Sequence, residues 1–489
     1  MKRRLIPLAL LVGSVASVAL TTVVLAAWTA TTATGGVSGA RAATLPAGNT
    51  PTATNAGGAS VTVAWTATTL PDGTGVAAYV VRAYNATSGA PRAIGADCDA
   101  VVATTCTETS APDGSWQYSV EPHQGLWGGA ESAKSNTVVV DTTAPTVAIT
   151  FPVAGGAYSS AGWSSGCAGQ ICGTAADAGT GVESVAVSIR APNGNYWNGT
   201  AFASNTEVLL RASGTTSWAR SFRATNFASD GIYTVRAVAT DNVGLTADAT
   251  TTFTLDTVQP TVAISFPGSD GAYDDAGWTA GCFDQICGTA ADTGSGLASV
   301  SLSIRNAIGN YWDGAAFASN TEVLVPATGT TNWALAFPAA DFPADGDYTV
   351  RAVATDNAGL TAEATTAFTI DNTQPTVEIA FPEESGIYDT AAWDAGCSSR
   401  ICGTAADTGS GVASMAVSIR DDNSGNYWDG TAFTSSTEIL LPGDGTTDWS
   451  FAFAAKDFPA DGDYTVRAVA TDRAGNTAEA SATFTITNE

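Results

Sequence analysis

A long internal repeat constrains the fold of this chain more than any other feature of its sequence. The segment "DTTAPTVAI" at Asp141 returns as "DTVQPTVAI" at Asp256 and as "DNTQPTVEI" at Asp371, so each copy begins 115 residues after the last (256 − 141 and 371 − 256). A unit of this length is longer than one solenoid repeat, and each copy is expected to fold around its own core. The expected domains are residues 141–255, 256–370 and 371–489.

Within each copy, apolar and polar residues alternate in short segments separated by turn residues. In the first copy the expected strands are "TVAITF", "ICGTAAD", "SVAVSIR", "TEVLLRA", "SWARSF", "YTVRAVATD" and "ATTTFTL". Short strands at this spacing indicate an antiparallel β-sandwich, and we letter them A to G. No segment after the N-terminal hydrophobic stretch combines helical periodicity with caps, so an all-β fold without helices is expected there.

Residues 44–140 show the same alternation and resemble a fibronectin type III domain. Trp65 matches the strand-B tryptophan, Tyr79 the strand-C tyrosine and Tyr118 the strand-F tyrosine, and "ESAKSN" matches the run before strand G. The three copies resemble bacterial Ig-like domains through their "PTV", "GTAAD" and "ATD" motifs, and "DGIYTVRAV" resembles a tyrosine corner. The resemblance implies tandem sandwiches of the kind found in secreted and surface proteins, whether adhesins, fibres or spacers on enzymes.

The N-terminus is typical of an export signal. "MKRR" is followed by the uncharged stretch Leu5–Trp28, which is long enough to span a bilayer. We expect residues 1–43 to be either a cleaved signal peptide or a retained signal-anchor helix, with a linker, and candidate cleavage sites lie near Ala26 and Ala42. Both alternatives place the remainder outside the cytoplasm, secreted or at the cell surface.

The charge balance excludes several partners. The chain has 46 acidic and 19 basic residues and a formal net charge of −27 at pH 7. Such a field repels nucleic acid and anionic lipid headgroups and attracts cations. We therefore expect no nucleic-acid partner, and membrane contact only through the N-terminal segment. Since His123 is the single histidine, a Ser or Cys nucleophile has no obvious base, and we expect no enzymatic activity.

The eight cysteines occur as local pairs. A zinc site needs about four nitrogen or sulfur ligands, and each copy offers two cysteines and no histidine. A thioredoxin-type motif has two intervening residues next to a helix, whereas the paired cysteines of the copies have four. An even number of cysteines in an exported chain indicates disulfides. The expected pairs are Cys98 with Cys106, Cys167 with Cys172, Cys282 with Cys287, and Cys397 with Cys402.

Three aspartates of each copy are expected to meet at one pole of its sandwich. Asp141 lies in the entering linker, Asp177 begins the B–C turn and Asp241 begins the F–G turn. Calcium binds six to eight hard oxygen ligands, and acidic tandem Ig-like proteins are similar in using it to stiffen linkers. The alternative is that the turn aspartates only cap their turns. The equivalent residues are Asp256, Asp292 and Asp356 in the second copy and Asp371, Asp407 and Asp472 in the third.

A tyrosine–tryptophan pair precedes a tight turn in each copy, which leaves two interpretations for Trp197, Trp312 and Trp428. Exposed aromatic rings can stack on sugars, so these residues are candidates for glycan binding. Neighbouring residues of a strand point to opposite faces, however, so one member of each pair is expected to fill the core.

The sequence as a whole predicts a rod of separately folded sandwiches. The favoured function is non-catalytic, structural or adhesive, presenting or spacing a binding surface for an extracellular protein or polysaccharide. The alternatives are a carbohydrate- or matrix-binding module array and an accessory part of a secreted enzyme system. Calcium is the only cofactor expected.

Overall fold

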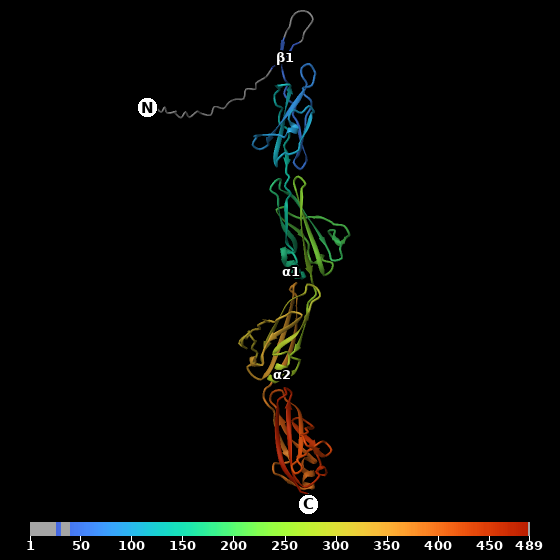
Figure 1. The fold of residues 1–489 in the computed structure, drawn as a ribbon, viewed down its shortest axis with the longest axis vertical. Helices are drawn as coiled ribbons and strands as arrows, with labels where there is room; N and C mark the ends of the chain where they lie inside the picture. The colour runs from blue at the N-terminus through green and yellow to red at the C-terminus, as the bar shows by residue number, and fades with distance from the viewer. Residues whose placement is uncertain (1–25, 31–39, 488–489) are drawn as a thin grey trace, which may run out of the picture.

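The computed structural model describes residues 26–30 and 40–487. These residues form an all-β chain of four sandwich units arranged end to end from the N-terminal to the C-terminal side (Figure 1). The expected signal or anchor helix lies largely outside the described residues. β1 (Ala26–Ala30) and β2 (Ala40–Thr44) form an antiparallel pair ahead of the first unit. Among the described residues, no helix is long and apolar enough to cross a membrane.

The first unit consists of two facing sheets. One contains β3 (Thr52–Gly57), β4 (Ser60–Ala64) and β7 (Thr105–Glu108). The other runs in the order β10 (Val138–Val140), β8 (Gly114–Gln124), β5 (Ala78–Asn85) and β6 (Pro91–Arg92), and β9 (Trp127–Gly128) pairs with β8. Trp65, Tyr79 and Tyr118, which carry the fibronectin type III resemblance, are buried between the sheets.

Each of the three repeats pairs a three-stranded sheet with a larger one. The small sheets are β11 (Thr146–Phe151), β13 (Gln170–Ala176) and β18 (Ser217–Ser221); β21 (Thr261–Phe266), β23 (Gln285–Ala291) and β26 (Asn332–Ala336); and β29 (Thr376–Phe381), β31 (Arg400–Ala406) and β36 (Asp448–Ala452). Every pairing in these sheets is antiparallel.

The larger sheets are built around one long antiparallel ladder of strands C, F and G. In the first repeat the order is β12 (Ala157–Tyr158), β20 (Thr246–Leu255), β19 (Gly231–Asp241), β14 (Val182–Arg190), β15 (Tyr196–Trp197) and β16 (Phe202–Ser204), and β17 (Leu210–Arg211) pairs with β14. The second has β22 (Gly271–Tyr273), β28 (Thr361–Ile370), β27 (Gly346–Asp356), β24 (Leu297–Arg305) and β25 (Val325–Pro326). The third has β30 (Ile387–Tyr388), β38 (Thr477–Ile486), β37 (Gly462–Asp472), β32 (Val412–Asp421), β33 (Tyr427–Trp428) and β34 (Phe433–Ser435), with β35 (Leu441–Pro442) on β32.

Two details of the sheets differ from the sequence prediction. The expected strand D, "TEVLLRA", is reduced to the two residues of β17, because only Leu210 and Arg211 pair with β14. The sandwiches are also not purely antiparallel, since the short strands β12, β22 and β30 run parallel to the last strand of their repeat.

The expectation that the repeats contain no helix is wrong. A six-residue helix follows the parallel strand in each repeat: α1 (Ser160–Ser165), α2 (Asp275–Ala280) and α3 (Thr390–Ala395). The side chains of Ser159, Asp274 and Asp389 cap these helices by accepting a bond from a backbone N–H three residues later. A helix of fewer than two turns is too short to show a 3.6-residue period, so the pattern could not reveal it.

The core of each repeat is aromatic. In the first repeat the helix delivers Trp163, which is fully buried and stacks on Phe253 with the ring centroids 5.0 Å apart. Tyr233 donates a hydrogen bond from its hydroxyl to the carbonyl of Ser229 (2.7 Å), as a tyrosine corner requires, and Tyr348 and Tyr464 make the equivalent bond. The corner fixes the start of strand F and hence the F–G turn at its other end.

A glycine on strand B makes room for the tryptophan of strand E. A Cβ atom on Gly288 would lie 2.1 Å from the carbonyl oxygen of Ala263 and 2.2 Å from the Trp333 ring. Both neighbours are fixed, one by the backbone and the other by burial. The equivalent glycines of the other repeats, Gly173 and Gly403, meet the same kinds of neighbour.

We predict that Gly288→Ala destabilises the second repeat by roughly 1–3 kcal/mol through overpacking. Gly268→Ala is the matched control, because a Cβ there lies 3.5 Å from the Tyr273 hydroxyl, an ordinary contact. Hydrogen exchange of the full chain reports the two variants repeat by repeat. Equal protection of the second repeat in both variants would contradict the packing described here.

Candidate metal centre

Three carboxylates from three separate segments meet at the entry pole of each repeat. In every group the three residues can each offer a ligand oxygen such that the three atoms lie within 4.8 Å of one another. The groups are Asp141, Asp177 and Asp241; Asp256, Asp292 and Asp356; and Asp371, Asp407 and Asp472. These are the nine aspartates that the sequence singles out, and the convergence expected from the sandwich topology is present in all three copies.

The linker aspartate is held by hydrogen bonds from the B–C turn. Asp141 accepts bonds from the Thr180 backbone N–H (2.6 Å) and hydroxyl (2.8 Å) and from the Thr143 N–H (3.1 Å). Burial opposes its ionisation, but these bonds hold the pKa of Asp141 below its usual value. Glycine is required beside it, because a Cβ on Gly179 would lie 2.2 Å from the Asp141 carboxylate.

The two turn aspartates each use one oxygen to cap their own turn. Asp177 Oδ2 accepts bonds from the N–H groups of Gly179 (3.1 Å) and Gly181 (2.6 Å). Asp241 Oδ1 accepts bonds from those of Val243 (2.9 Å) and Leu245 (2.8 Å). The capping role expected as the alternative to calcium is therefore present, and it accounts for half of the available oxygens.

The other oxygens of these carboxylates have no such role. Within the described structure, Asp177 Oδ1 and Asp241 Oδ2 are buried without a hydrogen-bond partner. The same holds in the second repeat for Asp292 Oδ1 and Asp356 Oδ2. An unpaired buried carboxylate oxygen is unfavourable unless a cation or a donor neutralises it. Hard oxygens from several carboxylates are the donors that calcium prefers, so these residues fit a calcium ion.

In the second group, burial and neighbouring charges also disfavour the ionised form of one carboxyl. Asp356 is 2% exposed, and burial raises the pKa of its carboxyl. The neighbouring charges of Asp256 and Asp292 raise the Asp356 pKa further, although hydrogen bonds from the Leu360 and Ala358 N–H groups oppose the shift. Without a cation, the ionised form of Asp356 is therefore less favourable in the folded protein than in the unfolded chain.

The third group differs from the first two in the hydrogen bonds of its F–G aspartate. Asp407 Oδ1 is buried without a partner in the described structure, like its equivalents. Asp472 Oδ2, however, accepts a hydrogen bond of 2.8 Å from the side-chain amide of Asn476. The same amide nitrogen donates to the backbone carbonyl of Asp371, also at 2.8 Å.

The preceding unit holds each linker from the other side, a feature that the sequence analysis missed. An aspartate in the Asp-Gly turn before strand F accepts a bond from the backbone N–H that follows the linker aspartate. The pairs are Asp113 with Thr142 (2.9 Å), Asp230 with Thr257 (3.0 Å) and Asp345 with Asn372 (3.0 Å). For Asp230 and Asp345 the sequence signal is the Asp-Gly pair that also opens the segments resembling a tyrosine corner.

The helices of the first two repeats approach the F–G turns of the repeats that follow them, where the second and third aspartate groups lie. A Cβ on Gly162 of α1 would lie 4.0 Å from the carbonyl oxygen of Ala358, in the F–G turn of the second repeat. Gly277 of α2 approaches Ala474 of the third repeat in the same way, at 3.9 Å. At the corresponding place between the first unit and the first repeat there is a cleft of about 530 Å³, lined by Asp113 and Val139 on one side and by Thr180 and Asn242 on the other.

All eight cysteines are joined in the pairs predicted from the sequence. In the repeats each disulfide connects the second residue after the short helix to strand B, as between Cys167 and Cys172 of β13. The disulfides therefore fix the helix to the sandwich, and they leave no thiol to ligate a metal.

The burial of the tryptophans favours their core interpretation over glycan binding. Trp197, Trp312 and Trp428 are only 6%, 7% and 8% exposed, because they pack into the core clusters of their repeats. Trp312 lies against Phe337, with the ring centroids 5.1 Å apart. A ring enclosed in this way cannot offer its face to a sugar.

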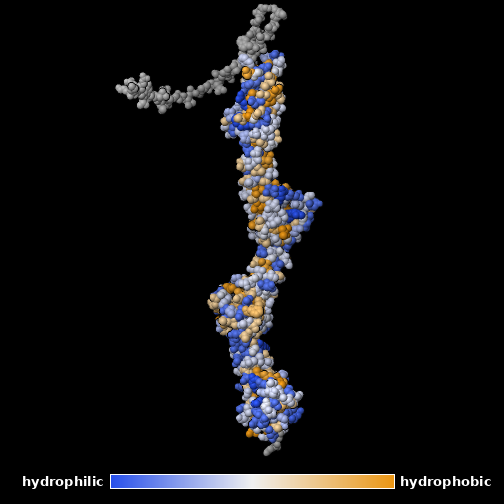
Figure 2. Space-filling model, in the orientation of Figure 1, coloured by the Kyte–Doolittle hydropathy of each residue, from blue (hydrophilic) through white to orange (hydrophobic). Residues whose placement is uncertain are grey.

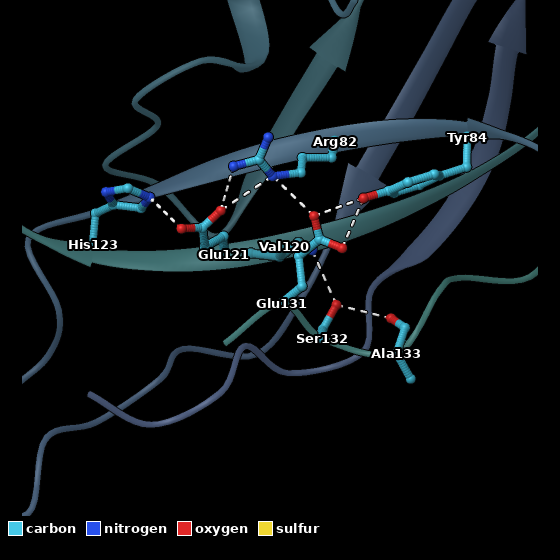
Figure 3. A network of polar contacts seen from close by, with 8 residues as sticks. All are labelled: Arg82, Tyr84, Val120, Glu121, His123, Glu131, Ser132 and Ala133. Atoms are coloured by element: carbon cyan, nitrogen blue, oxygen red, sulfur yellow. Dashed lines mark hydrogen bonds and ion pairs between the residues drawn. The ribbon is translucent and has the colours of Figure 1, made fainter. Parts of the chain in front are cut away.

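A second polar cluster lies on the first unit (Figure 3). Arg82 contacts Glu121 (2.5 Å) and Glu131 (2.9 Å), and His123 contacts the other oxygen of Glu121 at 3.1 Å. Tyr84 donates its hydroxyl to Glu131 (2.7 Å). Because charges of both signs are paired here, the cluster fastens the "ESAKSN" segment to β5 and β8 and does not form a cation site.

The surface offers no second candidate of comparable definition among the described residues. Figure 2 shows apolar and polar patches intermixed along the length of the face in view. Leu126, Phe283 and Ile308 are highly exposed, but they lie in different turns far apart in the sequence. Single exposed apolar residues of this kind are ordinary in soluble proteins.

We predict that Trp312→Ala destabilises the second repeat by about 3–5 kcal/mol, because it removes a buried aromatic ring. Tyr311→Ala is the control, because Tyr311 is only half-buried and its truncation should cost much less stability. Hydrogen exchange and a polysaccharide pull-down are measured on both variants. A Trp312→Ala protein with wild-type protection and reduced polysaccharide binding would restore the sugar-binding interpretation.

We predict that Asp356→Asn stabilises the second repeat at pH 7 in a chelating buffer, by roughly 1 kcal/mol or more, since it removes a buried unpaired charge. Because the folded pKa of Asp356 is raised, its protonation stabilises the fold below the ordinary value of 3.8, and this contribution is lost as the pH rises through the folded pKa. The advantage of the variant should thus disappear below pH 3.8.

Calorimetry compares the wild type and the Asp356→Asn variant at each pH. This comparison is needed because protonation of groups with lowered pKa values, such as Asp141, destabilises both proteins on acidification. A variant that is less stable than the wild type at pH 7 without divalent cations would contradict this electrostatic description.

Comparison with known proteins finds a family match for the second and third repeats. Residues 281–372 and 376–488 match the family model of the bacterial Ig-like domain. A search of curated proteins found no match. Among solved structures, a tetra-tandem repeat from the extending region of a large adhesion protein is 17% identical and covers 91% of this chain and 100% of its own, with a TM-score of 0.31.

Two further structures are similar at the same level. Part of a 1.5-MDa bacterial ice-binding adhesin is 17% identical over 65% of this chain and 91% of its own (TM-score 0.26). Chicken CNTN1 FN1–FN3 domains are 12% identical over 66% and 99% (TM-score 0.23). Similarity this low says nothing about function. The two matched segments, residues 281–372 and 376–488, are therefore similar to the bacterial Ig-like domain, and they lie in a tandem array of β-sandwiches.

Proposed function

We propose that this protein is a non-catalytic extracellular rod whose joints are stiffened by calcium, and that it acts as a structural or adhesive spacer. The proposed domains are residues 44–140, 141–255, 256–370 and 371–489, so that each joint coincides with an aspartate of a linker. The rod would present or space a surface that contacts an extracellular protein or polysaccharide.

One observation carries the proposal. Each candidate centre draws one carboxylate from the linker and two from turns of the sandwich that follows, as with Asp256, Asp292 and Asp356. In the first two repeats, two of the carboxylate oxygens are buried without a partner in the described structure. A cation shared by the three segments would join the linker to the domain and remove the freedom of the joint.

The bonds from the preceding unit support the same role. In the linker between the first and second repeats, Asp230 of the first repeat accepts a hydrogen bond from Thr257. The adjacent linker residue, Asp256, belongs to the carboxylate group of the second repeat. A calcium ion would therefore complete a connection that is already half made by hydrogen bonds. Calcium sites of extracellular modules typically have dissociation constants of about 10⁻⁴ to 10⁻³ M, which suits a joint that is stiff outside the cell.

Export is supported by two features of the chain. "MKRR" and the uncharged stretch Leu5–Trp28 are typical of a signal or signal-anchor. Four disulfides join all of the cysteines, and such bonds persist in oxidising compartments outside the cytoplasm. We accordingly place the sandwiches outside the cytoplasm, secreted or at the cell surface.

The alternative of a carbohydrate-binding array is less well supported. Its candidate residues Trp197, Trp312 and Trp428 lie in the cores of the repeats. The candidate centres also do not resemble a hydrolytic site. Their carboxylates are enclosed at domain joints and are occupied in part by backbone N–H groups, as for Asp177 and Asp241.

We predict that calcium binds the full chain and raises its melting temperature, with a stabilisation of about 2.7 kcal/mol for a repeat whose site sees calcium at 100 times its dissociation constant. Removal of calcium with a chelator should reverse the effect. Isothermal titration calorimetry measures the binding, and differential scanning calorimetry measures the stability.

The variant Asp356→Asn should lose the calcium response of the second repeat. Asp313→Asn is the matched control, because Asp313 lies in an exposed turn outside the group and the first repeat carries Asn198 at the equivalent position. The proposal is wrong if calcium neither binds the wild-type chain nor changes its melting.

A further inference from the structure

The F–G turn of the third repeat differs from those of the other two at a position that faces the candidate metal centre. The turn is "DNVGL" in the first repeat, "DNAGL" in the second and "DRAGN" in the third. Asn476 therefore stands where the other repeats have Leu245 and Leu360.

This substitution changes the hydrogen bonding of the buried carboxylate. Asn476 Nδ2 donates to Asp472 Oδ2 at 2.8 Å. In the described parts of the first two repeats, the equivalent oxygens of Asp241 and Asp356 are buried and have no partner. A leucine side chain has no donor to offer them. All three aspartates are at most 2% exposed, so water does not distinguish the third centre from the other two.

Asn476 also spans the joint. Its amide nitrogen donates to the backbone carbonyl of Asp371, which belongs to the linker, at 2.8 Å. Asp472 is the last residue of β37, so a single side chain connects the linker to the F–G turn. In the proposed function, that connection is the task of the calcium ion.

We propose that Asn476 replaces much of the work of the cation at the third joint, so that this joint is ordered without calcium and binds calcium more weakly than the joint at Asp256. The proposal rests on the calcium-dependent function above. A cation that used Asp472 Oδ2 would have to displace an amide donor from a charged acceptor, which is a strong type of hydrogen bond. We expect the calcium affinity of the third site to be about tenfold lower than that of the second site.

Site-resolved hydrogen exchange of the full chain tests the inference. Exchange is followed in peptides that cover the B–C turns at Asp292 and Asp407, first in a chelating buffer and then over a titration with calcium chloride. The third turn should be protected without calcium, whereas the second should gain protection on titration. Any calcium response of the third turn should have a midpoint about tenfold higher.

Two reciprocal substitutions locate the effect at one position. Asn476→Leu should remove the calcium-free protection of the third joint and give it the calcium midpoint of the second. Leu360→Asn should protect the second joint without calcium and raise its midpoint by about tenfold. Arg473→Asn is the control, because Arg473 is the other residue of the turn that departs from the repeats and its charge alone could weaken cation binding.

The outcomes separate this inference from the proposed function. If all joints respond to calcium with the same midpoint, the inference is overturned while the calcium function stands. If Arg473→Asn reproduces the effect of Asn476→Leu, the assignment to Asn476 is likewise overturned. If the wild-type second joint does not respond to calcium, the proposed function itself fails. Should Asn476→Leu not fold, Leu360→Asn gives the same test in the opposite direction.

Discussion

The mutual repulsion of three carboxylates, two of them buried and one half-buried, is the interaction on which the organisation of this chain depends. Each group gathers one aspartate from the linker and two from turns of the following sandwich, as Asp256, Asp292 and Asp356 do. Backbone N–H groups satisfy some of the oxygens, and the remainder create a local demand for positive charge. Because the linker supplies one member of the group, whatever meets that demand also determines how two domains are joined.

The surrounding structure is arranged to hold these carboxylates in place. The tyrosine corner and the long F and G strands position the F–G turn, and the disulfide fixes the short helix to strand B. The helices α1 and α2 approach the F–G turn of the next repeat. At the joint between the first unit and the first repeat, a cleft lies in the equivalent position. The joints are therefore similar in chemistry and different in packing, and the third adds a hydrogen-bonded bridge through Asn476.

Much of this arrangement could be predicted from the sequence, because it follows from periodicity and topology. The all-β class rests on the alternation of apolar and polar residues, the disulfides on locally paired cysteines, and the convergence of the nine aspartates on spacings that the three copies share. The short helices could not be predicted, since six residues show no period, and neither could the hydrogen bonds of Asp230 and its equivalents to the linkers. The sequence does not decide whether Trp312 is buried, because alternation along a strand places one member of a Tyr–Trp pair inside without indicating which one.

A rod with cation-dependent joints differs from a flexible string of the same domains in its shape in solution. Small-angle X-ray scattering of the full chain, compared in calcium and in chelator, measures that difference directly. We predict a larger maximum dimension and a narrower distribution of shapes in calcium, because the joints at Asp141 and Asp256 become fixed. Identical scattering profiles in the two buffers, with calcium shown not to bind, would contradict it.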